Sequence, residues 1–207
     1  MKVKQITKDL YHATLIGFTP TDCYREEVAD PMMRKGFVYA TDGRFCVRMG
    51  NGADLGYQTI GKRVGLCEKI DGFVDESAYP KAKSFKVDTK ILKTAAMFAI
   101  ADAMEAADKD EDEFGHSDFY DEVEQYALVE IKGKQFRARY INQIADTLYL
   151  HGEDRAKLFL LPKKLIIKAG NLAFAVMGVR CITGGTNGYS VVDGLTCDFI
   201  RHEARWC

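Results

Sequence analysis

The fold of this 207-residue chain is decided by residues 134–181, which read KQFRARYINQIADTLYLHGEDRAKLFLLPKKLIIKAGNLAFAVMGVRC. Ile141, Ile144, Ala145 and Leu148 recur at helical spacing, which predicts an amphipathic helix over residues 139–150. Gly152 is expected to end it. Three short apolar runs follow, at residues 157–161, 165–169 and 172–179, and two tight turns separate them. The stretch therefore predicts a helix laid against an antiparallel meander of three strands.

Single residues along this stretch form a recognisable series: Phe136, Tyr140, Ile141, Ile144, Leu148, Phe159, Ile166 and the run AVMGVR at residues 175–180. The series resembles the closing half-domain of the bacterial sliding clamp, the beta subunit of DNA polymerase III. In that family a strand with phenylalanine leads into a helix of the pattern Y-(I/L)-x-x-(I/V)-x-x-(A/L)-L, and the chain ends on V-M-P-M-R. Residues 36–47, GFVYATDGRFCV, resemble the strand-turn-strand of these domains. Gly178 stands where the family usually has proline.

The resemblance implies an α+β fold of clamp-like lobes, with helices packed on one face of mainly antiparallel sheets. It implies a polymerase processivity factor or a descendant of one, encoded by a phage or mobile element, that contacts duplex DNA and a peptide of a polymerase. Clamp rings contain six lobes, so a chain of two lobes would form a homo-oligomer of three copies. The alternative is a DNA-independent protein-interaction module that reuses the fold, and a small-molecule binder in the tail region also stays open.

Taken in order, the chain predicts a strand at residues 1–6, a short helix at residues 8–16, a hairpin at 36–49 around Asp42-Gly43, and two short strands at 57–74. Tyr79-Pro80 then marks a boundary. A helix is expected at residues 88–107 with Asp88 as its N-cap, strands at 126–131 and 135–137, and a strand pair at 189–192 and 197–200. We expect a divergent clamp-like lobe at residues 1–84, a second lobe at 85–181 and an extension at 182–207.

Composition and charge limit the classes of protein to which this chain can belong. Hydrophobic residues make up 47% of the chain, enough for a packed core. No run of about 18 apolar residues occurs and no targeting segment is recognised at the start, so we expect no membrane contact and a cytoplasmic location. Residues 102–124 carry eleven acidic residues and one basic residue, a net charge of −10. Since the whole chain has a net charge of −1, the remainder carries +9.

The acidic segment has two interpretations. A block of like charge repels itself and stays solvated, which favours a mobile acidic loop. Alternatively, it restricts DNA to one face of the protein.

Neither catalysis nor metal binding is indicated. The six cysteines contain no C-x-x-C pair, and the four histidines lie far from one another, with none at ligand spacing from a cysteine. Cys46 lies in an apolar strand pattern and is expected to be a small buried hydrophobe. Asp42 is explained by turn geometry, and the glycines of residues 184–188 lack the ending of a phosphate loop. We expect a non-enzyme without metal or cofactor.

The candidate DNA contacts are the basic residues on or next to the predicted helices: Lys8, Lys90, Lys93, Arg137 and Arg139. Phosphate neutralisation by such residues would give non-specific, salt-dependent binding. The alternative is that they are ordinary solvated charges.

The candidate peptide cleft comes from the resemblance alone. The positions that match the terminal strand of the clamp family are Ala175, Met177 and Val179. Methionine is adaptable and common at such pockets. The alternative is core packing, since alternate residues of any buried strand are apolar.

Overall fold

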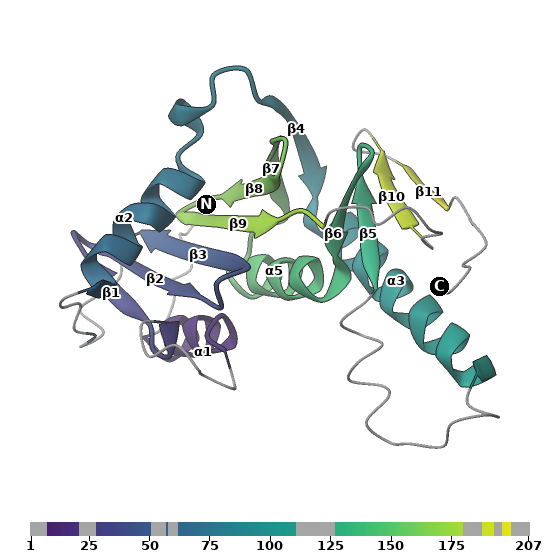
Figure 1. The fold of residues 1–207 in the computed structure, drawn as a ribbon, viewed down its shortest axis with the longest axis horizontal. Coiled ribbons are helices and arrows are strands. Elements are labelled where there is room, and N and C mark those ends of the chain that lie inside the picture. Colours follow the sequence, from purple (N-terminus) through teal and green to yellow (C-terminus); the bar gives the residue numbers. More distant parts are fainter. Residues whose placement is uncertain are drawn as a thin grey trace. The chain divides into compact units, whose positions relative to one another are not determined.

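The structure, a computed structural model, describes residues 8–20, 28–50, 57, 62–110, 127–179, 188–192 and 196–199. The chain divides into two compact units. The first unit consists of Met1–Ser84 and Thr147–Met177, and the second of Phe85–Asp146 and Gly178–Cys207. Figure 1 gives the element labels used below.

A seven-stranded sheet organises the first unit, in the order β1-β2-β3-β9-β8-β7-β4. Its strands are β1 (Met32–Arg34), β2 (Phe37–Thr41), β3 (Phe45–Gly50), β7 (Arg155–Leu160), β8 (Lys164–Ala169), β9 (Leu172–Met177) and β4 (Lys83–Asp88), which begins in this unit. The predicted hairpin and three-stranded meander are confirmed, and β3 pairs antiparallel with β9. Asp42 accepts hydrogen bonds from the backbone N–H groups of Arg44 and Phe45 at 2.7 and 2.9 Å. The aspartate therefore serves the turn, as predicted.

The two faces of this sheet are covered by different helices (Figure 1). On one face, α1 (Lys8–Gly17), which was predicted, leads into Phe18, whose ring packs 4.7 Å from Phe45 and 5.6 Å from Phe174. On the other face, α2 (Lys62–Val74) covers a cluster that includes Cys46 and Ala175. Alternate residues of a strand point to opposite faces, so Phe174 and Ala175 divide between the two layers.

The prediction of two short strands at residues 57–74 is wrong, because residues 62–74 form α2. Cys67, Ile70 and Val74 are fully or almost fully buried at spacings of three and four, which is a helical period. Gly65 and Gly72 interrupt this period in the sequence and weaken intrinsic helix propensity. Tertiary contacts secure the helix instead.

Polar contacts fix α2 against the strands. The Tyr39 hydroxyl on β2 donates to Asp71 of α2 at 3.1 Å, and Arg48 on β3 lies 3.1 Å from the same carboxylate. At the other edge Arg34 forms an ion pair with Glu68 at 2.7 Å. These contacts set the position of α2 over the sheet.

The second unit contains a four-stranded sheet of order β11-β10-β5-β6 and the helix α3 (Thr89–Asp110). Its strands are β5 (Leu128–Ile131), β6 (Lys134–Arg137), β10 (Gly188–Val192) and β11 (Thr196–Phe199). The predicted pairing of the last two strands is confirmed, and β10 also pairs parallel with β5. Helix α3 contacts β5 and β10.

The two longest predicted helices are confirmed, with ends close to those expected. The backbone N–H of Lys90 donates to Asp88 at 2.8 Å, so Asp88 is the N-cap of α3. Helix α5 (Ala138–Leu150) ends at Gly152, whose positive φ of 74° allows a Schellman motif. In it, the N–H of Glu153 donates to the carbonyl of Leu148 at 2.9 Å. The Lys93–Asp146 ion pair holds α3 beside the first part of α5.

The compact units differ from the contiguous lobes 1–84, 85–181 and the extension 182–207 expected from the sequence. The first division at Ser84 is the same, but residues 147–177 group with the N-terminal segment. Hydrogen bonds between β3 and β9 join these two stretches of chain into one sheet. The α+β class with mainly antiparallel sheets is confirmed.

Some predictions fall on residues outside the described ranges: the strand at residues 1–6, the acidic segment from 111 to 124 and the glycines of residues 184–188. Across the described part of the chain, no helix is both long and apolar enough to span a bilayer.

Candidate functional site

A cavity of about 560 Å³ opens in the first unit beside α2. Helix α2 contributes Leu66, Ile70 and Phe73 to its wall, the start of β3 contributes Phe45 and Cys46, and β9 contributes Ala175 and Met177. The volume lies within the roughly 300–1,000 Å³ of typical ligand pockets, and the walls are mainly apolar. This is a hollow of the size and chemistry that holds a few apolar side chains.

One position in the cavity wall has no side chain. Gly65 of α2 lines the cavity, and a Cβ added there would meet no heavy atom within 4 Å. Gly72 lies two turns further along α2, is equally unobstructed, and does not line the cavity. The glycine at position 65 therefore leaves open a space that a larger side chain would occupy.

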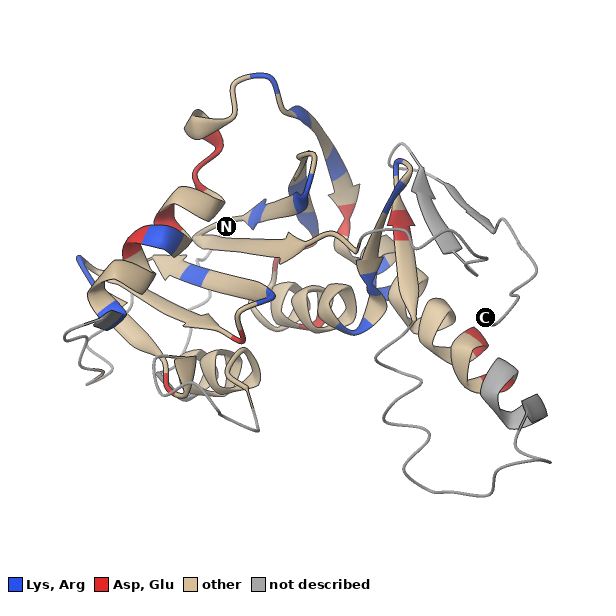
Figure 2. Ribbon diagram, in the orientation of Figure 1, with Lys and Arg blue, Asp and Glu red and all other residues tan. Residues whose placement is uncertain are grey.

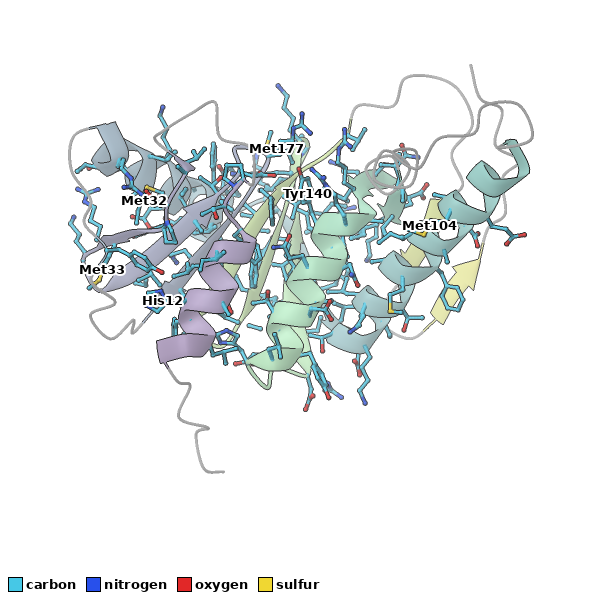
Figure 3. The ribbon with its side chains drawn as sticks, turned by 90° about the horizontal axis from the view of Figure 1, so that it is seen from below. His12, Met32, Met33, Met104, Tyr140 and Met177 are labelled. Atoms are coloured by element: carbon cyan, nitrogen blue, oxygen red, sulfur yellow. The ribbon has the colours of Figure 1, made fainter. Side chains whose placement is uncertain are left out.

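Two of the three positions predicted for a peptide cleft line this cavity. Met177, at the end of β9, is 45% exposed, and its backbone N–H donates to the carbonyl of Arg44 at 3.0 Å (Figure 3). Ala175 is buried in the floor beneath α2. Val179 is not among the lining residues, and its N–H donates instead to Gln135 in the second unit at 2.8 Å.

The charged residues that line the cavity are all basic: Arg44, Lys69 and Lys164. Arg44 and Lys69 are exposed, whereas Lys164, at the start of β8, is only 8% exposed. Figure 2 shows the basic residues of β8 within a sheet that carries little acidic colour. The cavity is therefore apolar and electropositive.

The two buried cysteines near this site are not poised for nucleophilic chemistry. Burial raises the pKa of the Cys46 thiol to about 12 and that of Cys67 to about 11. A thiol with such a pKa is protonated at neutral pH, and the thiolate is the nucleophile. Both residues are free and buried, as expected for Cys46. Within the described ranges, no group of three His, Cys, Asp or Glu side chains could hold a metal ion.

The residues predicted to contact DNA have different surroundings. Lys8 begins α1, and Lys90 is exposed in the first turn of α3. Lys93 is paired with Asp146. Arg137 ends β6, and Arg139 stacks 4.7 Å from the ring of Tyr140 and donates to its hydroxyl at 2.9 Å (Figure 3). Lys93 and Arg139 are therefore engaged within the protein.

Sequence reasoning missed the wall that α2 supplies, because residues 57–74 were expected to be strands. The detectable signal was the helical spacing of Cys67, Ile70 and Val74. The role of Lys164 left no such signal, since a lysine next to a proline-containing turn is usually a solvated charge.

Comparison with known proteins identifies the fold. A putative DNA polymerase III beta subunit from Eubacterium rectale superposes with a TM-score of 0.50 at 8% sequence identity, over 84% of this chain. Similar structures include the beta subunit of the DNA polymerase of Streptococcus pyogenes (TM-score 0.48, 10% identity, 85% of this chain and 64% of that one) and the DNA polymerase sliding clamp of Pseudomonas aeruginosa (0.45, 12%, 85% and 66%). This chain spans 63% of the length of the E. rectale protein.

No family model matches the sequence, and no curated protein matches it. At 8% identity, the likeness shows the fold alone. The predicted resemblance to sliding clamps is thereby confirmed at the level of the fold.

Proposed function

We propose that this chain is a non-enzymatic protein whose cavity binds an apolar peptide segment of a DNA polymerase or another replication protein. In this proposal it acts as a processivity factor or is a descendant of one, in the cytoplasm. The observation that carries the proposal is the cavity beside α2, which contains Ala175 and Met177 at its β9 wall. These are two of the positions at which the resemblance to clamps places a peptide cleft.

The walls favour an apolar occupant because they leave large hydrophobic side chains in water. Phe73 is 44% exposed and Met177 is 45% exposed, while Leu66 and Ile70 line the same space. Full burial of one leucine or phenylalanine side chain contributes roughly 1.5–3 kcal/mol. Two such side chains contribute roughly 3–6 kcal/mol before the cost of ordering the peptide, which gives weak and reversible binding. The flexible side chain of Met177 suits such an exchangeable ligand.

The experiment blocks the cavity from inside. A random dodecapeptide display library is selected on the intact chain, and the enriched peptides are measured by fluorescence anisotropy on the wild type, Gly65→Phe and Gly72→Phe. We expect at least tenfold weaker binding to Gly65→Phe and unchanged binding to Gly72→Phe, because only position 65 lines the cavity. Peptides that bind all three proteins equally, or a library without any enriched peptide, would refute the proposal.

The identity of the partner needs a second measurement. An array of overlapping peptides that tile the DNA polymerases encoded in the same genome is probed with the wild type and Gly65→Phe. Enrichment of one polymerase segment that depends on an open cavity is the expected result. Cavity-dependent peptides that match no replication protein would remove replication from the proposal.

Contact with duplex DNA is a separate part of the proposal, through Lys8, Lys90, Lys93, Arg137 and Arg139. The Lys93–Asp146 pair and the stacking of Arg139 on Tyr140 favour the alternative, a DNA-independent interaction module. The test compares duplex binding at low and moderate salt by the intact chain and by a variant with Lys90, Lys93, Arg137 and Arg139 changed to glutamate. Equal binding by both proteins, or no binding by either at low salt, would remove DNA contact from the proposal and support the DNA-independent interaction module.

Assembly is also proposed. In this proposal the predicted lobes at residues 1–84 and 85–181 each supply one lobe of a six-lobed ring, so three copies would close it. Sedimentation equilibrium at several protein concentrations measures the mass directly. A mass of one chain at every concentration would exclude the ring.

A further inference from the structure

Lys164 is a buried cation held only by neutral groups among the described residues. Its Nζ donates to the backbone carbonyl of Phe73 at 3.0 Å and to the hydroxyl of Tyr79 at 2.8 Å. The same ammonium lies 4.6 Å from the ring centroid of Phe73 and 4.4 Å from that of Tyr79. No carboxylate of the described chain pairs with it. An ammonium offers three donors, so one remains beyond these two hydrogen bonds.

This arrangement is unusual for a buried charge. A buried ammonium is ordinarily paired with a carboxylate, because its transfer out of water is costly. On the same strand, Lys168 forms an ion pair with Glu76. Lys164 therefore has no carboxylate partner in the described part of the chain, and it lines the cavity.

The rest of the lining has the same sign of charge. Arg44 and Lys69 are exposed on the cavity wall, and no Asp or Glu occurs among its described lining residues. Among the described residues, the acidic residues next to the lining in sequence have partners outside the cavity: Asp42 holds its own turn, Glu68 pairs with Arg34, and Asp71 accepts from Tyr39 and Arg48. The cavity therefore combines an apolar wall with three cations that have no described carboxylate partner.

We infer that the occupant of the cavity is a peptide with an aspartate or glutamate beside its apolar side chains, and that Lys164 receives the carboxylate. The inference rests on the proposed function and specifies the class of peptide. A side-chain carboxylate reaches a recessed ammonium while the peptide backbone stays outside the apolar walls, where water satisfies its polar groups. A terminal carboxylate would bring the last backbone groups in with it.

A purely structural role for Lys164 has a different consequence. Phe73 lies in the last turn of α2, where carbonyl groups attract a cation, so Lys164 also stabilises the end of that helix. If this were its whole role, the protein would not distinguish an acidic peptide from its amide counterpart.

The experiment uses a peptide from the dodecapeptide selection that depends on an open cavity and contains Glu or Asp. It is made with an acetylated N-terminus and an amidated C-terminus, alongside a version with Gln or Asn at that position. We expect the amide version to bind the wild type about 10- to 100-fold more weakly, which is the usual strength of a hydrogen bond to a charged group. The difference should shrink in Lys164→Met and persist in Lys163→Met, a neighbouring exposed lysine outside the cavity.

Each result decides the question. Equal binding of the acidic and amide peptides, or cavity-dependent peptides without any acidic residue, overturns the inference and leaves the proposed function. Peptides that bind only with a free C-terminal carboxylate overturn the choice of a side chain. The absence of any cavity-dependent peptide overturns the proposed function itself. If Lys164→Met fails to fold, the comparison of the acidic and amide peptides on the wild type still tests whether the cavity prefers a carboxylate. Lys69→Gln and Arg44→Gln then measure how much of that preference comes from the two exposed cations.

Discussion

The hydrogen bond between Tyr39 and Asp71 holds one wall of the cavity, and its strength can be measured by a double-mutant cycle. The Tyr39 side chain is almost fully buried, and its hydroxyl lies 3.1 and 3.2 Å from the two carboxylate oxygens of Asp71. Burial, and then the charge of Asp71, raise the pKa of Tyr39 well above its usual value. The hydroxyl is therefore protonated, and so a donor, at neutral pH.

The expected costs follow from what each substitution leaves behind. Tyr39→Phe removes the hydroxyl, and Asp71, whose side chain is 38% exposed, keeps Arg48 and gains water, so the loss should be about 1 kcal/mol. Asp71→Ala leaves a buried hydroxyl without an acceptor and should cost about 3 kcal/mol. The double variant removes both partners and should cost about 2 kcal/mol, less than Asp71→Ala alone.

The assay is urea unfolding followed by far-ultraviolet circular dichroism, on the wild type, both single variants and the double variant. Glu68→Ala is the matched control on α2, because the Glu68 side chain is 61% exposed and its ion pair with Arg34 should contribute about 0.5 kcal/mol or less. Rescue of Asp71→Ala by Tyr39→Phe is the decisive result. Costs that simply add, or a Tyr39→Phe variant as stable as the wild type, would show that α2 is not fixed to the sheet by this contact.

Three further predictions concern stability. His151 is buried with its Nε2 3.1 Å from the hydroxyl of Thr14, its Nδ1 has no hydrogen-bond partner among the described residues, and burial lowers its pKa. The unfolded chain binds a proton at a higher pH than the folded chain, so the free energy of unfolding should fall as the pH drops below about 6.5. In urea titrations between about pH 6.5 and 5, this free energy should depend less on pH in His151→Gln than in the wild type. Asp88→Ala should lower the unfolding free energy by about 1 kcal/mol through loss of the α3 N-cap; a midpoint equal to that of the wild type would contradict the cap. Gly65→Ala and Gly72→Ala should each raise the free energy of unfolding by roughly 0.5–1 kcal/mol, since the added Cβ meets nothing within 4 Å. A lower thermal midpoint in either variant would argue against a helix at residues 62–74.

Local sequence determined those elements whose residues carry their own signal. The period of Ile141, Ile144 and Leu148 gave α5, and Gly152 ended it because only a residue tolerant of positive φ fits there. The Asp42-Gly43 turn and the apolar runs around it were sufficient for the hairpin. These signals are local because each depends on backbone conformations and hydrogen bonds within a few residues.

Helix α2 and the cavity were decided by tertiary structure. The glycines at positions 65 and 72 lower the helix propensity of residues 62–74, so the helix depends on the burial of Cys67, Ile70 and Val74 against the sheet and on the partners of Asp71 on distant strands. Lys164 meets Phe73 and Tyr79 across more than 80 residues of chain, and only the folded sheet brings them together. A pattern within one stretch of sequence reports the face that the stretch will bury, but which groups meet across that face is set by packing. For that reason the sequence alone determined β9 and its Met177, whereas the hollow beside that residue and the charge that lines it arose from the contact of α2 with the sheet.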